Sequence, residues 1–497
     1  MKEVMNKTMK HRAMNPYLPL YEYIPDGEPR IFGDRLYVYG SHDYAGGALG
    51  FCPGDYMVWS APLDDLGDWG LDGVGFPRSK CPEGLKPDDA MAAPDVVRGV
   101  DGRYYLYYNA TKNNCRIAVS DRPEGPFEPY GDVCNPDGTS YVNSKMFDPG
   151  VLVDDDGKAY LYVGFCMPGP VPEWLKKPGA DYPQHSLGFE LASDMKTIVR
   201  GPVPIIPGGN VTAGTGFEGH GFYEASSPRK INGMYVMVYS SELSHEMAYA
   251  ISDKPLGTYT YQGTLVSCGD FGLNGNTVPV MPYGNVHGGL AQLNGSWYIF
   301  YHRHTSGQEA SRQGCAERLP IRPDGWFGQA EITSCGLNQG PLPAEGSYNA
   351  CYCCHLTSPS IAPRRLTVRE CRRDTETHIY EEPAGQDETE HLHYIANVET
   401  GTVVGYKYFR FEEGKKVSLR LRGKGKVRVS ACLDRPDAGE TDAGERRLEG
   451  GTWEEISLDL SRVSGEHALY FKFQTEERIQ FEGFSFVEIM LNSSEFS

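Results

Sequence analysis

The sequence predicts an all-β protein, with a five-bladed β-propeller over residues 14–340, a linker over 341–359 and a β-sandwich over 360–497. Three observations predict this class. With 497 residues the chain exceeds what one hydrophobic core usually serves, so two domains are expected. Its 59 glycines, 35 prolines and 32 tyrosines suit many short strands joined by tight turns. One hairpin-like pattern recurs five times without long helical patterns between the copies, which is typical of a propeller.

Each copy reads as a short strand, a turn marked by glycine with Asp or Asn, and a second strand rich in Tyr, Val, Leu and Ile. The copies begin at Pro25, Pro94, Asp148, Glu224 and His287. Their aligned tyrosines lie 55 to 75 residues apart, at Tyr37, Tyr105, Tyr160, Tyr235 and Tyr298. This spacing leaves room for four short strands in each copy, which is the size of a propeller blade.

An ionisable residue stands near the start of each copy, 10 to 12 residues before the tyrosine: Asp26, Asp95, Asp148, Glu224 and His287. The first strand of a blade is its innermost one, so these side chains are expected to converge near the central channel. Turn chemistry explains an Asp beside Pro, but it does not explain a Glu and a His at the equivalent positions. The shared register therefore predicts a functional site.

Clustered carboxylates raise one another's pKa, and a nearby cation lowers it, so their protonation states can differ. Glycoside hydrolysis needs this difference, with one protonated acid for the leaving oxygen and one ionised carboxylate that activates water or attacks the anomeric carbon. A metal cage is the competing use, but hard cations prefer tightly grouped oxygens to acids spaced around a ring. Hydrolysis is the favoured interpretation.

Four segments resemble glycoside hydrolase family 43 over about residues 14–340: NPYLPLYEYIPDGEPR, AAPDVV, FDPGVLVDDDGKAYL and FYEASSPRKINGMY. The resemblance implies inverting hydrolysis of arabinose- and xylose-containing glycans, with Asp26 as general base, Glu224 as general acid and Asp148 keeping the pKa of the acid raised. In an inverting enzyme the acid and the base stand about 6.5–9.5 Å apart. Glu218 is a rival for the acid, but only Glu224 keeps the register. The family often has a tryptophan before the Ala-Pro-Asp of the second blade, but Met91-Ala92-Ala93-Pro94-Asp95 lacks it, so one wall of the sugar site is expected to differ.

Substrate-binding residues are predicted with less support from the pattern: Asp95, His42, Phe51, Trp59, His287 and Arg303. By resemblance, His287 faces the channel, where it can hold a calcium ion through water. The alternative for His287 is a hydrogen bond within the core. No organic cofactor is expected, because no glycine-rich phosphate loop stands in a strand-turn-helix context.

The C-terminal segments KKVSLRLRGKGKVRVSACL and WEEISLDLSRVSGEHALYFKF alternate apolar and polar residues, which predicts a β-sandwich. After a propeller hydrolase, this domain resembles carbohydrate-binding module family 6. A binding module would expose aromatic side chains, and Trp453 and Tyr394 are the candidates. The alternative is a sandwich that packs on the propeller and shapes or shields the active site.

The formal net charge of −19 disfavours nucleic acid and anionic membranes as partners and favours a neutral oligosaccharide. The odd count of 13 cysteines and the absence of a signal-like apolar stretch near the start predict reduced thiols and a cytoplasmic location. The run Cys351, Cys353, Cys354 and His355 lacks zinc-site spacing and is expected to be an alternating β-strand. The sequence leaves the oligomeric state open.

Together these observations predict an inverting, exo-acting hydrolase that releases α-L-arabinofuranosyl or β-D-xylosyl units from plant-type oligosaccharides. Two alternatives stay open. One is a retaining, fructosidase-like propeller, whose two carboxyl groups would stand only about 5 Å apart. The other is a propeller that binds sugar without chemistry.

Overall fold

The computed structural model describes residues 11–47, 49–82, 84–86, 89–110, 114–142, 146–170, 184–361, 365–366, 374–382 and 391–488. Over these residues the fold is all-β, as predicted, and its helical elements are short 3-10 turns: η1 (Ala45–Gly47), η2 (Arg78–Lys80), η3 (Gly209–Val211), η4 (Leu273–Gly275) and η5 (Ala350–Tyr352). In this part of the chain, no helix is long and apolar enough to cross a bilayer.

Five sheets follow one another along residues 28–318, and each begins with one of the predicted hairpins. The first sheet contains β1 (Glu28–Phe32), β2 (Arg35–Tyr39), β3 (Tyr56–Pro62) and β4 (Gly70–Phe76). The second contains β5 (Ala92–Arg98), β6 (Tyr104–Asn109), β7 (Arg116–Ser120) and β8 (Glu128–Asp132). The third contains β9 (Gly150–Val153), β10 (Ala159–Val163), β11 (His185–Leu191) and β12 (Ile198–Pro207).

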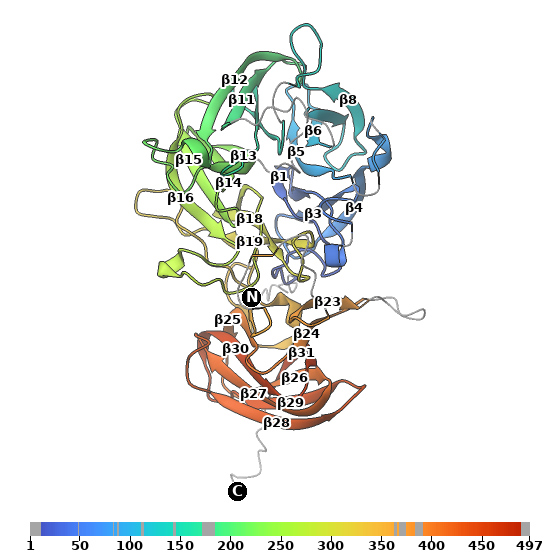
Figure 1. Cartoon of the computed structure of the whole chain (residues 1–497), viewed down its shortest axis with the longest axis vertical. Helices are drawn as coiled ribbons and strands as arrows, with labels where there is room; N and C mark the ends of the chain where they lie inside the picture. The colour runs from blue at the N-terminus through green and yellow to red at the C-terminus, as the bar shows by residue number, and fades with distance from the viewer. Residues whose placement is uncertain are drawn as a thin grey trace, which may run out of the picture.

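The fourth sheet contains β13 (Phe222–Ile231), β14 (Met234–Ser241), β15 (Glu246–Ser252) and β16 (Thr260–Ser267). The fifth has three strands, β17 (Leu290–Leu293), β18 (Ser296–His304) and β19 (Arg312–Arg318). Figure 1 shows the sheets arranged around a common centre, with β1, β5 and β13 near it and β4, β8, β12 and β16 toward the rim. This arrangement is that of a β-propeller.

The hairpin turns have the chemistry that the sequence pattern predicts. Asn232 and Gly233 join β13 to β14, and Asn294 and Gly295 join β17 to β18, all with positive φ. A two-residue turn with positive φ at both positions matches the twist of antiparallel strands and favours Asn-Gly. The turns therefore fix the register of these two hairpins.

Tyrosines from the second strands pack between neighbouring sheets and send their hydroxyl groups across the junction. Tyr39 donates to the carbonyl oxygen of Pro123 at 2.7 Å, and Tyr162 donates to that of Pro255 at 2.7 Å. Both rings are almost completely buried. These two tyrosines therefore serve the packing of the sheets, and each of their hydroxyl groups has the partner that burial requires.

The C-terminal residues form two further six-stranded sheets that pack face to face. One sheet contains β20 (Leu342–Pro343), β22 (His355–Thr357), β25 (Val403–Phe411), β27 (Lys424–Leu433), β28 (Asp442–Glu449) and β30 (Gly465–Thr475). The other contains β21 (Gly346–Asn349), β23 (His378–Glu382), β24 (Leu392–Val398), β26 (Lys415–Arg422), β29 (Glu454–Asp459) and β31 (Ile479–Glu488). Aromatic rings of the two sheets meet between them, for example Tyr406 and Phe484 at 4.8 Å.

The segment 341–359, predicted as a linker, is part of these sheets instead. β20 and β22 pair with β25, and β21 pairs with β31. The strands have two to four residues beside Gly and Pro, so their local sequence resembles a loop and tertiary pairing decides their structure. Cys351 lies in η5 and not in the alternating strand that was expected, because only His355–Thr357 is extended.

The propeller and the sandwich share one hydrophobic core. A single cluster of buried side chains contains propeller residues such as Val238 and Ile299 together with sandwich residues such as Val404 and Phe484. A buried lysine of β25 also crosses the junction, since Lys407 Nζ lies 2.8 Å from Glu331. Figure 1 shows the sandwich directly beside the edge of the propeller.

Candidate active site

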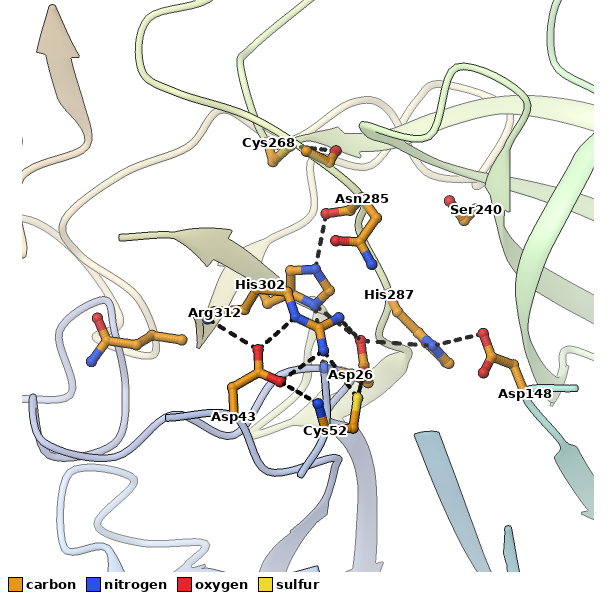
Figure 2. A network of polar contacts seen from close by, with 12 residues as sticks. Asp26, Asp43, Cys52, Asp148, Ser240, Cys268, Asn285, His287, His302 and Arg312 are labelled. Carbon is orange, nitrogen blue, oxygen red and sulfur yellow. Dashed lines mark hydrogen bonds and ion pairs between the residues drawn. The ribbon is translucent and has the colours of Figure 1, made fainter. Parts of the chain in front are cut away.

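Asp26 lies in the turn before β1, at the centre of the polar network shown in Figure 2. Its backbone has a φ of 58°, and its N–H donates to Nδ1 of His302 at 3.2 Å. One carboxylate oxygen accepts a hydrogen bond from Arg312 Nη1 at 2.9 Å, and the residue is only 4% exposed. Burial raises the pKa of Asp26, but the charge of Arg312, with contacts from His302 and His287, lowers it well below the usual range.

Arg312 begins β19 and is held by a second carboxylate. Its Nε donates to Asp43 Oδ2 at 2.7 Å and its Nη2 to Asp43 Oδ1 at 3.1 Å. Nη2 also donates to the sulfur of Cys52 at 3.2 Å, and the guanidinium lies 4.9 Å from the centre of the Phe51 ring. Because two nitrogens of the guanidinium donate to Asp43, the orientation of the group is fixed, and Nη1 points toward Asp26.

His287 lies between two of the predicted carboxylates. Its Nδ1 is 3.5 Å from Oδ2 of Asp148 and 4.0 Å from Oδ1 of Asp26. Asp148 stands just before β9 with a φ of 46°, so both aspartates occupy the same kind of turn in their sheets. Burial lowers the pKa of His287, but the hydrogen bond and charge of Asp148 outweigh it and raise the value to about 9. At neutral pH a protonated imidazole therefore bridges the two carboxylates.

Glu224 lies on the innermost strand of the fourth sheet, where β13 is irregular. The pairing of β13 with β14 shifts register on both sides of Glu224, and Ala225 has a φ of 70°. Such a bulge re-aims a side chain relative to a regular strand. Glu224 is 8% exposed, and burial, followed by the negative charge of Asp148, raises its pKa to about 8. Glu224 is therefore protonated at neutral pH while Asp26 is ionised.

A row of aromatic rings connects the neighbours of two of these carboxyl groups. Phe147 precedes Asp148 and contacts Phe165 at 5.3 Å between ring centres, and Phe165 contacts Tyr223 at 5.2 Å. Tyr223 precedes Glu224 and is half-buried. Flat apolar rings of this kind suit the apolar face of a sugar.

Asp95, predicted to bind substrate, takes part in a separate ion-pair network. Both of its oxygens accept from Arg30, at 2.9 and 2.6 Å, and one also accepts from the N–H of Val151 at 2.7 Å. Arg30 lies 3.5 Å from Glu28, which also pairs with Arg229. Asp95 thus ties the second sheet to the first and third.

Three other predicted binding residues are placed differently from one another. His42 and Trp59 both contact Glu22, His42 through Nε2 and Trp59 through its indole N–H, each at 3.0 Å. Trp59 is 3% exposed and lies in the core, so it offers no ring face to a sugar. Phe51 is half-buried beside Arg312, at the network of Asp26.

Arg303 is a correction to the prediction. It is 1% exposed, and its Nη1 donates to the carbonyl oxygen of Cys353 at the junction with the sandwich. Arg312, which the sequence reasoning missed, is the arginine that contacts Asp26. Arg312 lies on β19, which pairs with β18 but stands outside the hairpin pattern that the sequence analysis followed.

Glu218, the rival for the acid, is exposed in the loop before β13. Its carboxylate accepts hydrogen bonds from backbone N–H groups, its own and those of Gly214 and Thr215. These contacts lower the pKa of Glu218. A carboxylate with a lowered pKa is ionised at neutral pH and has no proton to donate. The local geometry therefore makes Glu218 a loop-stabilising residue.

The sequence predicts a calcium ion at His287, but the residues around it are poor ligands for calcium. Among the described residues, no group of three or more His, Cys, Asp or Glu side chains is arranged to hold a metal ion. Calcium prefers oxygen ligands to the ring nitrogens of a histidine. A calcium ion at His287 is therefore not supported by the residues that the structure describes.

The two aromatic residues of the sandwich that were predicted to bind glycan, Tyr394 and Trp453, are covered by another side chain. Tyr394 is 4% exposed, and the guanidinium of Arg422 lies 5.3 Å from its ring centre. The same guanidinium lies 4.5 Å from the ring centre of the half-buried Trp453. These rings therefore do not form the open platform that stacking on a glycan requires.

Comparison with known proteins places this geometry in a family. The model of glycosyl hydrolases family 43 matches residues 29–327. A xylosidase/arabinosidase of Thermoclostridium stercorarium is 39% identical over 94% of this chain and 97% of its own. A beta-xylosidase of Xylanibacter ruminicola is 30% identical over 56% of this chain and 88% of its own.

A solved family 43 β-xylosidase/α-arabinofuranosidase from a compost microbial metagenome, in complex with xylotriose, is 27% identical, with a TM-score of 0.51 over 64% of this chain and 98% of its own. The fold also resembles a family 43 arabinoxylan arabinofuranohydrolase from Bacillus subtilis, 20% identical, with a TM-score of 0.51 over 96% of this chain and 97% of that one. The family model covers more than half of the chain, and the relative from Thermoclostridium stercorarium aligns along nearly all of it. The chain therefore belongs to glycosyl hydrolases family 43 and is a glycoside hydrolase.

Proposed function

We propose that this enzyme removes terminal α-L-arabinofuranosyl or β-D-xylosyl units from plant-type oligosaccharides with inversion, using Asp26 as general base and Glu224 as general acid. The observation that carries the proposal is the opposite shift of two buried carboxyl groups. The pKa of Asp26 lies well below its usual range and that of Glu224 is raised to about 8. Separated pKa values are what assign the base and the acid in a glycosidase.

In the reaction, Asp26 accepts a proton from a water molecule as the water oxygen bonds to the anomeric carbon. Glu224 donates its proton to the glycosidic oxygen as the bond between that oxygen and the anomeric carbon breaks. Asp26 leaves the step protonated and Glu224 ionised, and exchange with solvent restores both. Attack opposite the leaving group inverts the anomeric centre.

Asp148 and His287 tune the acid and position the base in this proposal. The negative charge of Asp148 disfavours ionisation of Glu224 and so keeps a proton available for the leaving oxygen. The His287 imidazolium lies between Asp148 and Asp26 and offsets their mutual repulsion. Arg312 fixes one oxygen of Asp26, which directs the other toward the water.

The pentoside substrate class is supported by the relatives. The proteins 39% and 30% identical to this chain are named a xylosidase/arabinosidase and a beta-xylosidase. The net charge of −19 suits a neutral glycan better than an anionic one.

Nitrophenol release tests the proposal on α-L-arabinofuranoside, β-D-xyloside, β-D-galactofuranoside and β-fructofuranoside analogues. We expect activity on a pentoside that falls by at least about 100-fold in Asp26→Asn, because general-base catalysis contributes about 10²–10⁴. In Glu224→Gln, the loss of activity is expected to be larger for a more basic leaving group. The matched control Glu218→Gln is expected to keep wild-type rates. Loss in the Glu218 variant without loss in the Glu224 variant would overturn the assignment of the acid. A wild-type enzyme active only on fructofuranosides would overturn the substrate class.

A further inference from the structure

A residue from the C-terminal part of the chain, Arg365, lies among propeller loops that also carry active-site residues. Arg365 forms an isolated parallel bridge with Tyr283, and the N–H of Leu366 donates to the carbonyl oxygen of Tyr283 at 2.7 Å. Leu366 is 3% exposed, so it anchors the backbone of Arg365 in the core. Tyr283 belongs to the segment between β16 and β17 that also carries His287. Arg365 is thus attached to the segment that supplies the active-site histidine.

The side chain of Arg365 faces two charged or polar groups of the propeller. Its Nη2 lies 3.8 Å from Oε1 of Glu309, in the loop between β18 and β19. Burial raises the pKa of the Tyr223 phenol, the charges of Glu224 and Glu309 raise it further, and the charge of Arg365 lowers it. Arg365 is thus held between the segment that carries His287 and the loop that leads from Glu309 into Arg312.

Exposure indicates which part of a substrate reaches Arg365. Asp26 and Asp148 are each 4% exposed and Glu224 is 8% exposed, whereas the side chain of Arg365 is 47% exposed. An enzyme that removes terminal sugars encloses the released sugar, and the rest of the oligosaccharide extends toward solvent. The more exposed Arg365 is therefore expected on the side of the leaving group.

We propose that Arg365 binds the first sugar of the leaving group, with Glu309 as the positioning residue that orients the guanidinium. The proposal rests on the function proposed above. A planar guanidinium can donate two parallel hydrogen bonds to neighbouring hydroxyl groups. The 3.8 Å separation from Glu309 is longer than a direct hydrogen bond, so this pair orients Arg365 without occupying its donors. The adjacent carboxylate also offsets the positive charge, which suits a neutral sugar better than a uronic acid.

This assignment gives the sandwich a role in substrate selection. The chain that leaves the propeller after β19 forms β20 to β22, which pair with strands of the sandwich, and Arg365 comes eight positions after the end of β22. The sandwich thus holds one wall of the leaving-group site, which agrees with the alternative that it shapes the active site.

The test compares kcat/KM on a pentose disaccharide with kcat/KM on the 4-nitrophenyl glycoside of the same pentose, whose leaving group carries no sugar hydroxyls. In Arg365→Ala the ratio of disaccharide to nitrophenyl activity is expected to fall about 10-fold, equivalent to about 1.4 kcal/mol. Glu309→Gln is expected to lower the ratio less. Arg435→Ala provides the control, because Arg435 is a 75% exposed arginine of the sandwich, and its ratio stays at the wild-type value.

An unchanged ratio in Arg365→Ala, or equal losses on both substrates, would overturn the assignment. Titration calorimetry gives a second readout in the Glu224→Gln background. There, Arg365→Ala is expected to weaken the binding of the disaccharide about 10-fold relative to the monosaccharide. A wild type that cleaves no pentoside would refute the proposed function, whereas an active wild type with an unchanged ratio would refute only the role of Arg365. A wild type that neither cleaves nor binds the disaccharide would refute both.

Discussion

The proposed mechanism divides the chemistry between two carboxyl groups whose surroundings differ. Asp26 meets the guanidinium of Arg312 at 2.9 Å, whereas the charged group beside Glu224 that most affects its pKa is Asp148, another acid. Burial alone would raise both pKa values, so the nearby charge decides which group is ionised. The pH dependence of the reaction follows from these neighbours.

We predict that kcat/KM falls as the pH rises through about 8, where Glu224 loses its proton. Asp148→Asn removes the negative charge that raises the pKa of Glu224, so this falling limb moves to lower pH, by about one unit. The measurement is the pH profile of kcat/KM on the pentoside cleaved fastest. Asp156→Asn is the matched control, because Asp156 is an exposed carboxylate of the same sheet. A limb that stays in place or moves upward in Asp148→Asn would contradict the role given to Asp148.

The inner strands of the propeller are tied together by buried ion pairs. Asp95 of β5 binds Arg30 of β1 and the N–H of Val151 of β9, so one side chain connects three sheets. Breaking a buried pair leaves an uncompensated charge, which is more costly than losing an exposed pair. This places Asp95 in the scaffold of the channel.

Asp95→Asn is therefore predicted to lower the free energy of unfolding by about 3 kcal/mol and to change KM less than two-fold. Denaturant unfolding followed by fluorescence, together with steady-state kinetics, measures both. Asp101→Asn breaks an exposed pair with Arg103 and is expected to cost at most about 1 kcal/mol. A large rise in KM with unchanged stability in Asp95→Asn would contradict the structural role and would indicate that Asp95 binds substrate.

The hairpins and the converging acids could be predicted from the sequence because both repeat. The Asn-Gly turns and the aligned tyrosines define the strands, and the register places Asp26, Asp148 and Glu224 at equivalent starts. Arg312 was missed because it begins a third strand, outside the repeated hairpin. The strands of 341–359 were missed because runs of two to four residues carry no periodicity of their own.

The whole molecule is built around a core that does not stop at the end of the propeller. Side chains of β14, β18, β25 and β31 belong to one buried cluster, and Lys407 of β25 lies within 4 Å of Asp270 and Glu331 of the propeller. Separate domains usually have separate cores. The two parts are therefore expected to depend on each other for stability.

Differential scanning calorimetry is predicted to give one cooperative transition for the full chain, because unfolding the sandwich would expose the propeller face of the shared core. A chain ending at residue 340 lacks that cover and is expected to unfold at a lower temperature or to aggregate. Two well-separated transitions for the full chain, with the first matching the sandwich alone, would contradict a shared core.

The most direct test of the inverting assignment of Asp26 and Glu224 is the configuration of the sugar released first, followed by proton NMR before mutarotation. We predict α-xylose from a β-D-xyloside, or β-arabinofuranose from an α-L-arabinofuranoside, because a water activated by Asp26 attacks opposite the leaving group. First release of the sugar with the configuration of the substrate would mean a covalent intermediate and would contradict the role of Asp26 as a base.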